Sequence, residues 1–206
     1  MWADAMRLLN AYGTLGHWKL AHALVGELGL SFEAAPELAY VDAIASVHLG
    51  DRDRVAELCR SLVERFDGTR NPDRAALAVR VCLLAPSDRQ LPWGRVDDLA
   101  HRAPLVSRDY LRQSGLVGAS LLCGGDARAG LARLTEASSR TDGFDNPHTL
   151  LFAGEAARRA GDARGTATWS ARLGRALSGP WQARVRREPL GAWHVAEIEA
   201  LRMALP

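Results

Sequence analysis

Apolar positions along this chain recur at helical spacing. Four segments pair an apolar or small residue with another one three positions later: Val25 and Leu28, Cys59 and Leu62, Leu134 and Ala137, Ser170 and Leu173. Such spacing gives an amphipathic helix its buried side. The C-terminal stretch repeats the pattern with Trp193, Ala196, Ile198, Leu201 and Leu205. We therefore predict an all-α protein.

Four glycines, each followed by a turn-type residue, divide these helical segments. The dipeptides are Gly16-His17, Gly50-Asp51, Gly125-Asp126 and Gly161-Asp162, at intervals of 34, 75 and 36 residues. The longest interval is about twice the others, and a period in the mid-thirties is typical of stacked helical hairpins. Glycine adopts a positive φ without steric cost, and the following Asp can cap the next helix.

The long interval hides a fifth hairpin. Asn71-Pro72 is a helix start signal, residues 85–88 end that helix, and its partner is expected over 96–102. The predicted units are therefore about 2–35, 36–70, 71–108, 109–146 and 147–180, followed by a capping segment, 181–206. We predict one domain, a right-handed α-solenoid of about five tetratricopeptide-like (TPR-like) hairpins. Its C-terminal helix is expected to seal the apolar edge of the array.

The run from Val47 to Pro86 resembles a known kind of repeat region. It contains Gly50-Asp51, Cys59, Glu64-Arg65-Phe66, Asn71-Pro72 and Cys82-Leu83-Leu84-Ala85-Pro86. These motifs resemble TPR-like regions that follow serine/threonine kinase or WD40 regions in large planctomycete-type bacterial proteins. The resemblance implies a non-catalytic scaffold, as a fragment or subunit associated with a signalling or effector protein. The chain itself has no glycine-rich nucleotide loop and no HRD or DFG motif.

Candidate recognition residues follow from the hairpin frame. We number each unit by counting its turn glycine as position 15. The first helix of each unit is expected to line a concave groove, with positions 2, 5, 9, 12 and 13 facing it. The large polar and aromatic candidates are Tyr40, His48, Arg112, His148, Glu155, Arg158 and Arg159. The alternative is that some of them only pack between hairpins.

The expected groove is partly apolar. The positions of the carboxylate clamp of peptide-binding TPR proteins hold Ile44, Ala119, Leu122 and Cys123. We therefore do not expect that clamp. An amphipathic helix of a protein partner, or another domain of the same natural chain, suits such a groove better.

Charge leaves a second hypothesis open. The net charge is only +2, but arginines gather in the C-terminal third, including Arg158, Arg159, Arg184, Arg186 and Arg187. Such a basic cluster can contact the phosphates of a nucleic acid or an acidic partner. Acidic residues lie between these arginines and no aromatic platform accompanies them. We therefore expect a solvated helical face, and binding of a nucleic acid or an acidic partner through these arginines is the alternative.

The cysteines and histidines suggest little chemistry. Cys59, Cys82 and Cys123 form no CxxC pair, and no HExxH motif occurs, so we expect no metal and no cofactor. Cys59 and Cys82 fall on apolar helix faces and are expected to pack as reduced thiols in a cytoplasmic protein. The remaining alternative is an enzyme with Cys123 as its nucleophile. No apolar run approaches the roughly 20 residues of a membrane-spanning helix.

Overall fold

The computed structural model describes residues 2–29, 35–103, 113–139, 145–178 and 191–205. Within these ranges it contains eleven α-helices and no strand. The helices are α1 (Trp2–Leu15), α2 (Trp18–Leu28), α3 (Pro36–Leu49), α4 (Arg52–Phe66), α5 (Pro72–Leu83), α6 (Trp93–Arg102), α7 (Gln113–Cys123), α8 (Ala127–Ser139), α9 (Pro147–Arg159), α10 (Ala163–Ser178) and α12 (Gly191–Ala204). The prediction of an all-α protein is confirmed.

The helix boundaries follow the local signals. All four glycines of the repeated dipeptides have positive φ, between 70° and 105°. The Asp51 carboxylate accepts a hydrogen bond from Arg54 N, and Asp126 and Asp162 cap α8 and α10 in the same way. Asn71 caps α5 by accepting from Asp73 N and Arg74 N. These caps satisfy backbone donors that every helix start leaves open.

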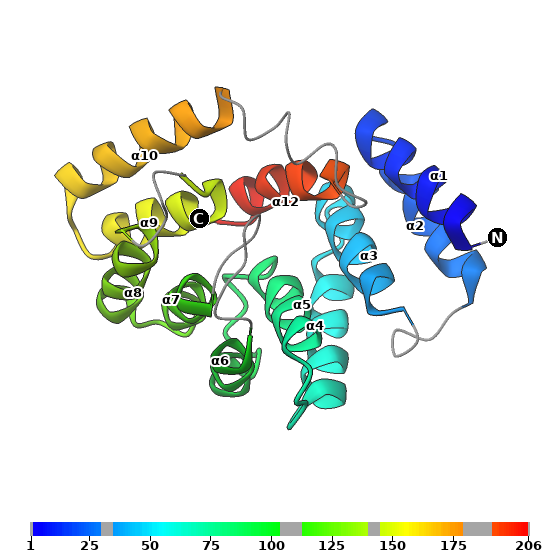
Figure 1. Ribbon diagram of the computed structural model, residues 1–206, viewed down its shortest axis with the longest axis horizontal. Coiled ribbons are helices and arrows are strands. Elements are labelled where there is room, and N and C mark those ends of the chain that lie inside the picture. The colour runs from blue at the N-terminus through cyan, green and yellow to red at the C-terminus, as the bar shows by residue number, and fades with distance from the viewer. Residues whose placement is uncertain (1, 30–34, 104–112, 140–144, 179–190, 206) are drawn as a thin grey trace.

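Consecutive helices from α1 to α10 pack against each other, and several helices also contact the helix two places further along the chain. Helix α3 contacts α5, α5 contacts α7, and α7 contacts α9, while α4 contacts α6 on the other side. We call α3, α5, α7 and α9 the inner helices. Figure 1 shows the helices following an arc, from α1 and α2 at one end to α9 and α10 at the other.

The hairpin of α7 and α8 depends on glycine at the helix contact. A Cβ added at Gly118 would lie 2.7 Å from the Leu134 side chain, and one at Gly130 would lie 2.8 Å from the Gly118 carbonyl oxygen. Real Cβ atoms do not approach other atoms this closely. The two glycines therefore allow α7 and α8 to pack closely.

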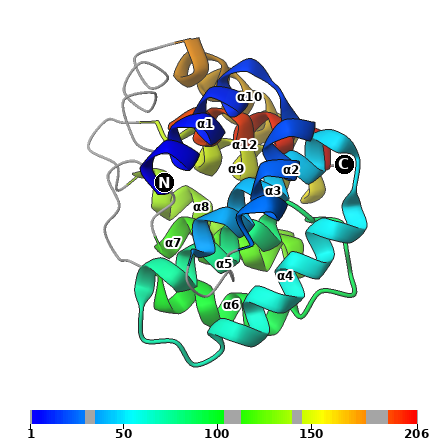
Figure 2. The same cartoon turned by 90° about the vertical axis from the view of Figure 1, so that its right-hand side faces the viewer.

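The last helix buries its predicted apolar residues in an unexpected place. Trp193, Ala196, Ile198 and Leu201 are buried. However, α12 does not simply cover the last hairpin, because it packs against α1, α3 and α9. Figures 1 and 2 show α12 on the inner side of the arc, between its two ends. The expected capping helix thus bridges the first, second and fifth predicted units.

The expectation of reduced Cys59 and Cys82 is wrong. The two buried sulfur atoms form a disulfide that links α4 to α5 across 23 positions of sequence. The disulfide forms because α4 and α5 pack with their apolar faces together. The spacing of the two cysteines in the sequence does not reveal this contact. Cys123 is buried and remains a free thiol.

Candidate functional site

The main candidate site is the surface of the inner helices that faces α12. Its centre is a cluster of four buried polar side chains, Tyr40, Arg80, His148 and Glu197, which we call the Glu197 cluster. They come from α3, α5, α9 and α12, respectively. Each of the four is at most 8% exposed. Inner helices distant in sequence therefore converge on one carboxylate of α12.

The Glu197 carboxylate accepts hydrogen bonds from all three neighbours. The donors are Tyr40 Oη, Arg80 Nη2 and His148 Nε2, each 2.9 Å from Glu197 Oε2. Arg80 Nη2 also donates to Tyr40 Oη at 2.6 Å, and its guanidinium carbon lies 4.2 Å from the centre of the Tyr40 ring. Arg80 and Tyr40 therefore hold each other as well as the carboxylate.

The charges of the cluster keep Glu197 ionised. Burial alone would raise the pKa of Glu197, but the positive charge of Arg80 and the hydrogen bonds from Arg80 and His148 hold it well below its usual range. Burial raises the pKa of Tyr40 well above its ordinary value, so its hydroxyl stays a donor. Burial and the nearby Arg80 lower the pKa of His194 on α12 to about 3, so its imidazole is neutral.

Aromatic rings hold the N-terminal half of α12. Trp18 and His48 are stacked with ring centres 3.9 Å apart, and Trp193 meets Trp18 edge-on at 5.9 Å. His48 Nε2 donates to the Ala196 carbonyl at 3.3 Å, and burial lowers the pKa of His48. A Cβ at Gly13 would lie 3.0 Å from the Trp193 ring, so α1 approaches this indole closely.

The predicted recognition residues separate into two groups. Tyr40, His48 and His148 all contact α12, as described above. Glu155, Arg158 and Arg159 instead form a local ion cluster on α9, in which Glu155 is 2.7 Å from Arg158 and 2.6 Å from Arg159. Burial would raise the pKa of Glu155, but hydrogen bonds from both arginines lower it. The predicted Arg112 lies outside the described residues.

Sequence reasoning missed Arg80 and Glu197. The third hairpin lacks the turn glycine from which positions are counted, so Arg80 was not assigned a position in the groove. Counting that unit from Pro72, by analogy with Pro36 and Pro147, places Arg80 at groove position 9. A lone arginine in the apolar run 75–84 was the available signal. Glu197 sits likewise among the apolar positions of α12.

The structure offers little to the alternative of a cysteine enzyme. Burial raises the pKa of the Cys123 thiol to about 12, whereas a nucleophile must ionise near neutral pH. Ser120 Oγ donates to Asp97 at 2.6 Å, and His101 lies 3.6 Å from the same carboxylate. There the acid, not the histidine, is beside the hydroxyl, which is the wrong order for activating serine.

Comparison of the chain with protein-family models, with curated proteins and with solved structures finds no match. Across the described residues, no group of three or more His, Cys, Asp or Glu side chains is arranged to hold a metal ion. None of the described helices is both long and apolar enough to cross a membrane. The geometry around α12 therefore carries the functional argument.

Proposed function

We propose that this chain is a non-catalytic scaffold that binds protein helices on its inner face. The supporting observation is that the inner helices already bind one helix, α12, through a buried cluster that includes two of the predicted recognition residues, Tyr40 and His148. His48, a third, contacts the backbone of the same helix. A surface that recognises a helix at specific positions is suited to bind a helix of a protein partner.

We further propose that the helices form a right-handed α-solenoid of five TPR-like hairpins. The serial contacts of the inner helices, and the contact of α4 with α6 behind them, support this architecture. The glycine turns at the mid-thirties period support it as well. By resemblance, the partner belongs to a bacterial signalling or effector system, either as a separate protein or as another domain of the natural chain.

Protein is a better candidate ligand than nucleic acid. Arg158 and Arg159, the described members of the predicted basic cluster that lie on α9, both pair with Glu155. Their charges are therefore partly neutralised. Arg184, Arg186 and Arg187 lie outside the described residues.

The cytoplasmic location stays a prediction. It rested partly on unpaired cysteines, and the Cys59–Cys82 disulfide removes that basis because such bonds persist mainly in oxidising compartments. Fractionation of the native cells would test it directly. Recovery of the chain outside the cytoplasm would contradict the prediction.

A selection experiment tests the scaffold function. The full chain is immobilised and challenged with a displayed library of helical peptides, and in parallel with DNA and RNA at low salt. We expect helical peptides to be enriched and to protect amides of α3, α5 and α9 from hydrogen exchange. Failure to enrich any helical peptide would contradict the proposal, and salt-dependent binding of nucleic acid in its place would favour the alternative.

A further inference from the structure

We propose that the inner face is a receptor for a partner helix with a tryptophan and, four residues later, a carboxylate, and that α12 occupies this receptor as an internal competitor. The inference rests on the proposed scaffold function and names its ligand. The template is α12 itself. Its buried stripe, Trp193, Glu197, Ala200 and Leu201, has the i, i+4, i+7, i+8 spacing of one helix face.

The buried charges support recognition over simple core filling. Replacing a buried ion pair by apolar residues of similar volume is often neutral or stabilising. A helix that served only to complete the core would therefore not need Glu197. The Glu197 carboxylate instead sets the register of the bound helix, since it accepts hydrogen bonds from Tyr40, Arg80 and His148. Shifting α12 by one residue would move this carboxylate away from the three buried donors.

Helix α12 leaves surface space beside it. Three pockets of about 310, 280 and 250 Å³, partly open to solvent, adjoin it, and each is lined partly by α12 residues. Among the described residues, the buried indole N–H of Trp193 has no hydrogen-bond acceptor. The surface space beside α12 can therefore hold larger side chains of a partner helix.

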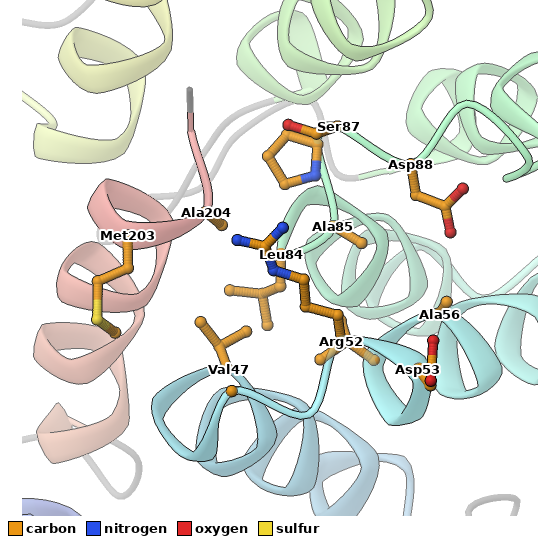
Figure 3. A pocket seen from close by; sticks show the side chains of 13 residues that line it. Val47, Arg52, Asp53, Ala56, Leu84, Ala85, Ser87, Asp88, Met203 and Ala204 are labelled. Carbon is orange, nitrogen blue, oxygen red and sulfur yellow. The ribbon is translucent and has the colours of Figure 1, made fainter.

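One of these pockets indicates how a partner would differ from α12. It lies at the C-terminal end of α12, between Ala204, Leu84 and the α3–α4 turn, and Figure 3 shows the Arg52 side chain extending into it. The last carbonyls of a helix carry partial negative charge that a guanidinium stabilises. A partner helix with an apolar side chain at the position of Ala204, continuing for another turn, would occupy this space and meet Arg52.

Competition within one chain has a defined consequence. A tethered helix acts at an effective concentration of about millimolar, so a free copy of the same helix binds weakly while α12 is docked. Weakening α12 raises the fraction of open receptor, and the apparent affinity for a free helix rises by the same factor. A substitution in α12 therefore weakens the internal competitor while the inner helices that form the receptor keep their sequence.

The experiment uses a fluorescent peptide with the sequence of residues 191–205 and the full chain. We expect the Glu197→Gln protein to bind this peptide at least tenfold more tightly than the wild type, by fluorescence anisotropy. A peptide that itself carries Glu197→Gln should bind the same protein at least tenfold more weakly. Glu64→Gln, an exposed change on α4, is the matched control and should behave as wild type.

Two results would overturn the inference. One is equal affinity of the charged and uncharged peptides for the Glu197→Gln protein. The other is a concentration-dependent dimer of that protein without peptide, which would make α12 of a second copy the occupant. Neither result removes the scaffold function, which fails only if the library selection yields no helical ligand.

Discussion

The Glu197 cluster makes a quantitative prediction for the substitution Glu197→Gln. The variant keeps the shape of the side chain but removes the charge that balances Arg80, which is only 8% exposed. Removing one partner of a buried ion pair typically costs about 3–5 kcal/mol, since the other charge is left uncompensated. We therefore expect a loss of about 3 kcal/mol in the free energy of unfolding.

Urea denaturation followed by circular dichroism measures this loss. For a chain of about this size, the same loss lowers the melting temperature by roughly 6–12 °C. The exposed control, Glu64→Gln, should stay within about 0.5 kcal/mol of wild type. Both variants remove one carboxylate from a helix, so their difference isolates burial and pairing.

A double-mutant cycle assigns the loss to the pair. With Glu197→Gln already present, Arg80→Met should cost much less than it does in the wild-type chain, because the uncompensated charge is removed. We expect a coupling energy above about 1 kcal/mol, within the range for contacting residues. Additive effects, or a loss below about 1 kcal/mol for Glu197→Gln alone, would contradict a stabilising ion pair between Arg80 and Glu197.

Three further predictions concern other parts of the molecule. Gly118→Ala should lower the free energy of unfolding by about 1–3 kcal/mol, because the new Cβ would meet Leu134 at 2.7 Å. Gly174→Ala, in open space on α10, should instead raise it by about 0.5–1 kcal/mol. Equal changes for the two variants in urea titrations would contradict the close packing of α7 against α8. Non-reducing peptide mapping should recover the Cys59–Cys82 disulfide, and its reduction should lower the free energy of unfolding by about 3 kcal/mol. Free thiols at these two cysteines in the unreduced protein would contradict the disulfide. The free energy of unfolding should fall as pH falls from about 6.5 towards 3, by up to about 1.4 kcal/mol per pH unit, because His194 is protonated in the unfolded chain but stays neutral in the folded one. The variant His194→Gln should show a flatter pH dependence, and an unchanged slope would contradict this prediction.

The local features of the fold were predictable. A glycine at positive φ and a capping Asp or Asn act over a few residues, so Gly50-Asp51 and Asn71-Pro72 mark helix ends in the sequence alone. Three of the predicted recognition residues, Tyr40, His48 and His148, contact α12. This too follows from local signals, because the position of a residue within its hairpin determines which side of the first helix it occupies.

The long-range features were not predictable from the same signals. The hydrogen bond between Tyr40 and Glu197 joins residues 157 positions apart, and it depends on where α12 docks. Amphipathic spacing shows that α12 has an apolar side but not which surface covers it. The disulfide likewise depends on the apposition of α4 and α5, which no spacing of Cys59 and Cys82 encodes.

If α12 is a bound helix on a receptor surface, it separates from the rest of the fold when its docking is weakened. Hydrogen exchange with mass spectrometry, on the wild type and on Glu197→Gln, measures this separation helix by helix. We predict that the variant loses protection in α12 and in the facing parts of α1 and α3, while α7 and α8 keep theirs. Equal loss of protection in every helix would contradict the claim, because α12 would then be an ordinary part of one cooperative core.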